Sequence, residues 1–229
     1  MPYFFNLEVL LWTAPAILLG MWAQMKVRST YAAASQEPAP LSGAAAARHI
    51  LDSAGLNGVD IEETPGFLSD HYDPQAKVLR LSPENYRGRS LAAVGIAAHE
   101  AGHAIQDAHA YKPLVIRNAA VPIASFGGGI SMTLLMIGVL MRMPFLLLAG
   151  IALFSTVVVF QLVNLPVEFD ASRRAKAQLV SLGIVPQQEM AHVNGVLNAA
   201  AWTYVAGTLQ AVLTLLYYVM AYTGNSRDE

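Results

Sequence analysis

The sequence contains no cysteine and little charge. Without cysteine the chain can form no disulfide, and any metal site must be built from histidine and carboxylate side chains. Charged residues make up only 13% of the chain and hydrophobic residues 55%, whereas soluble domains carry about 25% charged residues. A large part of this chain should therefore face lipid rather than water.

An excess of charge of either sign is also missing. The formal net charge is -2, and a nucleic-acid-binding protein normally presents a strongly basic face. We therefore expect no nucleic-acid partner.

Four long apolar runs are present instead. They cover residues 5–25, 119–139, 145–163 and 199–221, and each is close to the ~20 residues that a helix needs to cross the hydrocarbon core. Only residues 141–144 join the second run to the third, so these two should form a tight helical hairpin. A buried core helix of a soluble protein would explain one such run. Four of them favour an integral membrane protein.

The first run is either a removable signal peptide or a retained anchor. The three alanines at 32–34 resemble a cleavage site. However, the first eight residues contain no lysine or arginine, while Lys26 and Arg28 follow the run. Because the positive region of a signal peptide is missing, we expect an uncleaved anchor.

Lysine and arginine predict the orientation of the four spans. Segments 26–118 and 164–198 should share one side, and they carry twelve of the 14 cations, whereas the other side carries only Arg142 and Arg227. Loops rich in lysine and arginine stay in the cytoplasm. Both segments should therefore be cytoplasmic, and both termini should lie outside.

A helix expected from Ser90 to about Ala108 carries the motif His99-Glu100-Ala101-Gly102-His103. Histidines four residues apart lie one turn apart on one face, so their imidazoles can converge on one ion. With Glu100 beside them as general base, this is the arrangement of a zinc metalloprotease. A solvated helix with incidental histidines is the alternative. Small and apolar residues at 91–98 disfavour it, because they predict a buried helix in which unpaired polar groups are costly.

A catalytic zinc site needs a third protein ligand. His109 has the spacing of the long three-histidine motif, but that motif needs glycine where this chain has Gln106. No positional argument supports His71 or His192. Glu168 follows the third span and should lie on the same side of the membrane as the motif. From the residues alone, it is equally a zinc ligand or an ion-pair partner of a nearby cation, Arg173, Arg174 or Lys176.

Four stretches of the chain resemble the YugP-type neutral zinc metallopeptidases, which are bacterial membrane proteins. They are residues 79–86, 90–106 around His-Glu-Ala-Gly-His-Ala-Ile-Gln, 164–175 and 199–205. The resemblance implies a membrane-embedded peptidase of the gluzincin type, distantly similar to HtpX and the CAAX-processing membrane proteases. It implies one zinc ion per chain, bound by His99, His103 and Glu168, with Glu100 as the base.

One departure from the wider gluzincins concerns the residue that orients a zinc-binding histidine. Those enzymes commonly place an aspartate four residues after the ligand glutamate, where this chain has Ser172. Asp170 comes only two residues after Glu168 and should face elsewhere on a helix. Ser172, Asp170 and Asp107 therefore all remain candidates for this role. The residue that stabilises the oxyanion is open among His71, Tyr72 and Tyr204.

The predicted fold class is mainly α, with about four transmembrane helices and a small α+β zincin-like catalytic region. Local signals add a helix at 43–54 capped by Ser42, a turn at 70–74 and a strand at 76–81. We expect that strand to be an exposed edge to which an extended substrate adds. The expected parts are a transmembrane anchor (1–25), a cytoplasmic catalytic region (26–118), a transmembrane hairpin (119–163), a cytoplasmic helical segment (164–198) and a last transmembrane helix with a short tail (199–229).

The predicted function is a membrane-embedded zinc endopeptidase of the bacterial plasma membrane, with its active site at the cytoplasmic face. Its partners should be membrane lipid and a peptide or protein substrate, with membrane-associated substrates among the candidates. One alternative is a membrane binding or scaffold protein that keeps a zinc site without turnover. Another is a metal transporter, which the scarcity of ionisable residues inside the spans disfavours.

Overall fold

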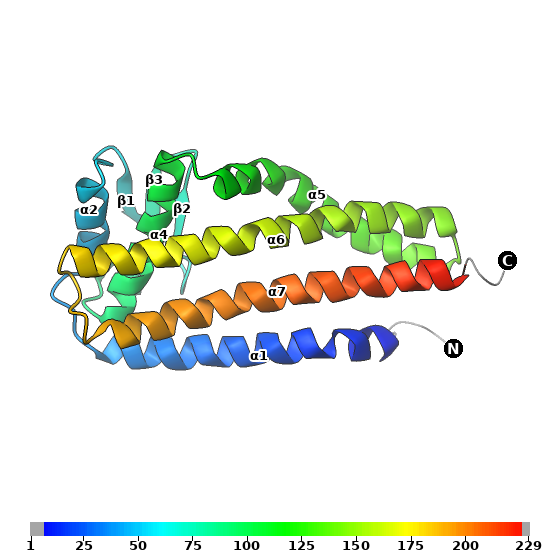
Figure 1. The fold of residues 1–229 in the computed structure, drawn as a ribbon, viewed down its shortest axis with the longest axis horizontal. Helices are drawn as coiled ribbons and strands as arrows, with labels where there is room; N and C mark the ends of the chain where they lie inside the picture. Colours follow the sequence, from blue (N-terminus) through cyan, green and yellow to red (C-terminus); the bar gives the residue numbers. More distant parts are fainter. Residues whose placement is uncertain (1–6, 226–229) are drawn as a thin grey trace. The chain divides into compact units, whose positions relative to one another are not determined.

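The computed structural model describes residues 7–225 as seven helices and three short strands (Figure 1). The helices are α1 (Leu7–Gln36), α2 (Gly43–Ser53), α3 (Pro83–Arg87), α4 (Leu91–Ala108), α5 (Lys112–Leu140), α6 (Pro144–Ser181) and α7 (Met190–Asn225), and the strands are β1 (Asp60–Glu63), β2 (His71–Asp73) and β3 (Val78–Leu81). The predicted fold class is confirmed: the chain is mainly helical with one small sheet.

Four of these helices are long and apolar enough to cross a membrane: α1, α5, α6 and α7. Each contains one of the predicted apolar runs, although residues 5 and 6 of the first run lie outside the described part. Helix α6 does not end with its apolar run at residue 163. It continues through Pro166 to Ser181, so Glu168 lies on the same helix as the third span.

The described chain divides into two compact units. The first holds α1 up to Trp22, residues 116–165 and α7 from Trp202. Within it, α5 and α6 form the expected hairpin, whose turn contains Arg142 in the left-handed region (φ 51°). A Cβ added at Gly138 would lie 2.6 Å from the backbone nitrogen of Leu147. Only glycine allows the two helices to approach this closely.

The second unit comprises residues 23–115 and 166–201 and contains the sheet. The strand order is β1-β3-β2, with β3 parallel to β1 and antiparallel to β2. The predicted exposed edge is therefore wrong: β3 is the central strand, and Val78, Leu79 and Leu81 are buried. A strand paired on both sides has no free backbone groups for a substrate.

The predicted turn at 70–74 is also wrong, because His71–Asp73 forms β2. The turn comes later, since the Asp73 carboxylate accepts hydrogen bonds from the backbone N–H groups of Gln75 (2.9 Å) and Ala76 (3.0 Å). Lys77 then completes the reversal with a positive φ of 55°. Such a side-chain-to-backbone turn moves the reversal toward β3 and leaves residues 71–73 extended.

Helices α2 and α4 pack on one another, and α4 also contacts β2 and β3. Both helices start as predicted. The Ser42 side chain accepts from Ala45 N–H at the start of α2, and the Ser90 side chain accepts from Ala93 N–H at the start of α4. A core of buried aliphatic side chains joins these helices to β3, including Ile50, Leu79 and Val94. This buried packing provides a rigid platform for the motif on α4.

Candidate active site

Helix α4 carries the two motif histidines and Glu100 next to the part of α6 that follows Pro166. A Cβ added at Gly102 would lie 2.6 Å from the carbonyl oxygen of Ala171. Glycine at this position therefore lets the backbones of α4 and α6 approach closely beside His103. The close approach brings Glu168 of α6, only 4% exposed, against the histidine face of α4.

His99, His103 and Glu168 form a compact cluster of candidate metal ligands. Their ligand atoms all lie within 4.8 Å of one another. Glu168 Oε2 is 3.3 Å from His99 Nε2 and 3.6 Å from His103 Nε2. Ligands bound at about 2.0–2.2 Å to a tetrahedral zinc ion lie roughly 3.3–3.6 Å apart. Two imidazoles and one carboxylate match the ligand chemistry of zinc, and the two separations from Glu168 Oε2 match its spacing.

Each histidine has a second partner on its other ring nitrogen. His99 Nδ1 is 3.1 Å from Ser172 Oγ, and His103 Nδ1 is 3.0 Å from Gln106 Oε1. If each Nε2 binds a metal, each Nδ1 carries the proton and donates these hydrogen bonds. Partners of this kind hold the rings of metal-binding histidines in place.

The three residues left open for orienting a histidine take different positions. Ser172 contacts His99 directly. Asp170 contacts neither histidine, but its Oδ2 accepts from Gln106 Nε2 at 3.0 Å. Asp107 accepts from the hydroxyl of Tyr72 and from Lys77. The sequence pattern marks Gln106 only as the residue that replaces the glycine of the long three-histidine motif. A polar side chain in a predicted buried stretch, one turn after His103, was the signal that could have identified it.

The ion pairs proposed as the alternative for Glu168 do not form. Arg173 and Arg174 both pair with Asp170, while the Lys176 ammonium donates to Asn198 Oδ1 at 2.7 Å. The contacts of Glu168 are with the two histidines instead. This leaves its carboxylate facing the cluster.

The structure does not bring the other candidate histidines into this cluster. His109 is the residue that ends α4, and its Nδ1 is 3.4 Å from a guanidinium nitrogen of Arg174. His71 Nδ1 lies 2.8 Å from the carbonyl oxygen of Ser69. Within residues 7–225, only His99, His103 and Glu168 form a group of three that can hold a metal, so His192 is outside it as well.

Burial shapes the electrostatics of the cluster. It raises the pKa of the Glu100 carboxyl above its ordinary value, and the charges of His99 and His103 only partly oppose this. Burial alone would lower the pKa of His103, but its hydrogen bond to Glu168, the charges of Glu100 and Glu168 and its hydrogen bond to Gln106 together outweigh burial, and the pKa of His103 is raised. Glu100 therefore has a stronger affinity for a proton than an exposed glutamate.

The oxyanion candidates lie in three different settings. The Tyr72 hydroxyl donates to Asp107 Oδ2 at 2.8 Å, next to Lys77 Nζ at 2.5 Å from the same oxygen. Burial, and then this hydrogen bond, raise the pKa of Tyr72 above its ordinary value. His71 is exposed on β2, and Tyr204 belongs to the other unit. The Tyr72 hydroxyl is thus held to α4 through Asp107.

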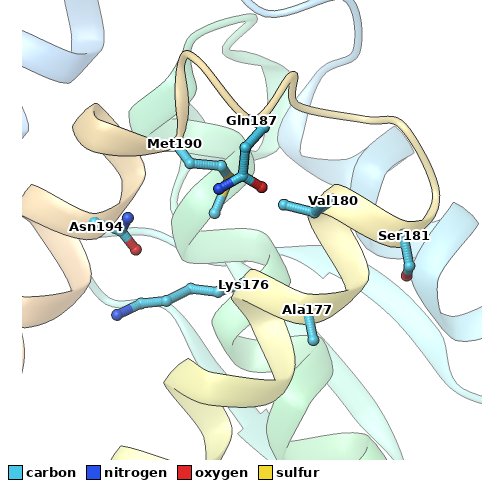
Figure 2. A pocket seen from close by; sticks show the side chains of 7 residues that line it. All are labelled: Lys176, Ala177, Val180, Ser181, Gln187, Met190 and Asn194. Atoms are coloured by element: carbon cyan, nitrogen blue, oxygen red, sulfur yellow. The ribbon is translucent and has the colours of Figure 1, made fainter.

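A separate hollow of about 430 Å³ lies between the end of α6 and the start of α7, shown in Figure 2. Its lining includes Lys176, Val180, Met190 and Asn194. It contains no histidine or carboxylate, so it offers none of the ligands that a zinc site requires.

Comparison with known proteins identifies the family of this chain. The family model described as "Putative neutral zinc metallopeptidase" matches residues 9–223. The curated protein "Putative membrane protease YugP" of Bacillus subtilis (strain 168) is 45% identical over 219 residues, which cover 95% of this chain and 97% of that protein. No solved structure matches the chain. Because the family model spans almost the whole sequence, this chain belongs to that family of neutral zinc metallopeptidases.

Proposed function

We propose that this protein is a membrane-embedded zinc endopeptidase of the gluzincin type. In this proposal one zinc ion per chain is bound by His99, His103 and Glu168, and Glu100 is the general base. The observation that carries the proposal is the cluster itself: three ligand atoms within 4.8 Å of one another, supplied by α4 and α6. The family membership independently supports zinc and peptide hydrolysis.

Zinc bound by these ligands would act as a Lewis acid that acidifies a water molecule and polarises a peptide carbonyl. Glu100 follows His99 directly and is 8% exposed. Its carboxylate accepts the proton of the attacking water and later delivers it to the leaving amine. Its raised pKa suits this role, because a general base works best when its pKa lies near the working pH.

The substrate in this proposal is a peptide or protein that reaches the site in an extended form. With β3 in the centre of the sheet, only the edge strands β1 and β2 can accept another strand. Of these two, β2 contacts α4. An extended chain added to β2 would therefore run beside the helix that carries the motif.

The location in this proposal is the plasma membrane of a bacterial cell, with the site at the cytoplasmic face. The support is the excess of lysine and arginine in segments 26–118 and 164–198, together with four helices able to cross a membrane. A reporter domain fused after Glu229 should be found outside the cytoplasm. A cytoplasmic signal from that reporter would overturn this orientation.

The test of the mechanism is the Glu100→Gln variant, purified in detergent with its zinc. We expect zinc content to equal that of the wild type and hydrolysis of a fluorescence-quenched peptide library to fall by about 10²–10⁴-fold, because the base is lost. Glu189→Gln makes the same change at an exposed position and should leave both values unchanged. Undiminished hydrolysis in Glu100→Gln would exclude the proposed base.

The same experiment separates the peptidase from a membrane protein that binds zinc without turnover. Such a protein would contain zinc in the wild type and in both variants. None of the three preparations would hydrolyse the library.

A further inference from the structure

Gln106 is a completely buried amide (0% exposed) three residues after His103 on α4. All three of its side-chain hydrogen bonds go to groups around the cluster. Gln106 Oε1 lies 3.0 Å from His103 Nδ1, and Gln106 Nε2 donates to Val167 O at 2.8 Å and to Asp170 Oδ2 at 3.0 Å. The residue thus touches one candidate ligand, His103, and the α6 turn that carries Glu168.

The two acceptors on α6 fix which way the amide points. A peptide carbonyl and an ionised carboxylate can only accept hydrogen bonds, so both require the NH₂ end of Gln106. Asp170 is 5% exposed and is kept ionised by Arg173 and Arg174, which both bind it. The reversed amide would place its oxygen against two other oxygens, so Oε1 must face His103.

This orientation determines where His103 carries its proton. An amide oxygen accepts only, so the hydrogen bond at 3.0 Å requires a proton on His103 Nδ1. In the neutral imidazole the proton is then absent from Nε2. That leaves the lone pair of Nε2 free on the side of the ring that faces Glu168 Oε2, 3.6 Å away.

We propose that Gln106 is a positioning residue that fixes the tautomer of His103 and aligns His103 with Glu168. The alignment comes from Val167, whose carbonyl Gln106 binds and whose neighbour in the chain is Glu168. Gln106 therefore sets how tightly the cluster binds zinc. This inference rests on the proposed zinc site.

The first test measures zinc affinity by competition with a chromophoric chelator in the detergent-purified full chain. Gln106→Met keeps the length of the side chain and removes all three hydrogen bonds, so affinity should fall by about 10–100-fold. Gln106→Glu keeps the acceptor for His103 but places a carboxylate against Asp170 and Val167 O, and should lose at least as much. Gln188→Met, the same change at an exposed position, should bind zinc like the wild type.

A second pair of variants separates positioning from general packing. Gln106→Glu combined with Asp170→Asn restores one donor and one acceptor between the two side chains and keeps the total charge. It should recover at least tenfold of the affinity lost in Gln106→Glu alone. Circular dichroism should show unchanged helix content in every variant that is compared, and a double variant no better than Gln106→Glu would contradict the proposal.

The closing measurement is the ¹⁵N side-chain spectrum of histidine in the zinc-free chain at alkaline pH, where imidazoles are neutral. His103 should carry its proton on Nδ1 in the wild type and shift toward Nε2 in Gln106→Met. An unchanged His103 tautomer together with unchanged zinc affinity would overturn the inference. If the wild type bound no zinc at all, the proposed function would fail, and the spectrum would still decide the role of Gln106.

Discussion

Two buried hydroxyls of the first compact unit and two buried amides of the second are satisfied in different ways. In the first unit, the Thr13 hydroxyl donates to Val9 O and the Ser131 hydroxyl to Gly128 O, both within their own helices. In the second unit, Asn85 binds Asp70 and accepts from Tyr31, and Gln106 links α4 to α6. The two amides of the second unit therefore join elements that are far apart in sequence.

The difference shows which contacts specify each unit. A hydroxyl bonded to its own helix says nothing about the neighbouring helix, so close glycine contacts such as Gly138 on Leu147 hold the hairpin together. A polar network between elements is costly when it is incomplete and specific when it is satisfied. The candidate zinc ligands lie in the unit that uses such networks.

Paired glycine substitutions give the largest expected effects. Gly102→Ala and Gly138→Ala both place a Cβ 2.6 Å from a backbone atom of the facing helix. Each should destabilise its unit by about 1–3 kcal/mol, the usual cost of overpacking. Only Gly102→Ala should also weaken zinc binding, by at least about tenfold, because it moves α6 and Glu168 away from the histidines. Equal zinc affinities in the two variants, measured by chelator competition, would contradict the separation of roles.

Removing one buried polar side chain from each unit should lower stability less than the glycine substitutions do, and the loss should be larger in the second unit. Asn85→Ala takes away the donor to Asp70 Oδ2 (2.8 Å) and the acceptor for the Tyr31 hydroxyl. It should cost about 1–3 kcal/mol, since a buried partner is left unsatisfied. Ser131→Ala removes only a bond within α5 and should cost less than about 0.5 kcal/mol. Thermal unfolding in detergent measures both, and similar losses would break the comparison.

Acid should lower the stability of the second unit more than that of the first, because Glu8 is the sole carboxylate side chain among the described residues of the first unit. Hydrogen bonds from Ala76 N–H, Arg80 and Gln75 N–H lower the pKa of Asp73 to about 2. A lowered folded-state pKa adds stability that is present above the unfolded-state value of ~3.9 and is lost as pH falls toward 2. Asp73→Asn should remove that part of the acid dependence. Its unfolding temperature should therefore change less between pH 4 and pH 2 than that of the wild type.

Local signals were enough to predict the starts of α2 and α4 and the motif, but not the short helix α3. Ser42 and Ser90 cap their helices as expected, because an N-cap acts through its own neighbours in the chain. The prediction of a turn at 70–74 was wrong because the Asp73 carboxylate binds the backbone N–H groups of Gln75 and Ala76. The chain therefore reverses after residue 73, and residues 71–73 form β2. The central position of β3 depends on its pairing with β2 on one side and with β1 on the other, which its own residues do not encode.

The candidate site could be predicted only in part for the same reason. Spacing on one helix placed His99, Glu100 and His103 together, and the family resemblance supplied Glu168. The role of Gln106 depends on Val167 O and Asp170, more than 60 residues away. No periodicity within α4 indicates such a partner, so only the packing of α4 on α6 shows it.

The central claim is that His99, His103 and Glu168 together bind zinc, and metal content per chain tests it most directly. Wild type and Glu168→Ala would be purified in detergent and compared, with Glu189→Ala as the matched exposed control. We predict close to one zinc ion per chain in the wild type and the control, and loss of the metal in Glu168→Ala. Zinc retained in Glu168→Ala would contradict the ligand set. No zinc in any preparation, even after zinc is added, would contradict the peptidase itself.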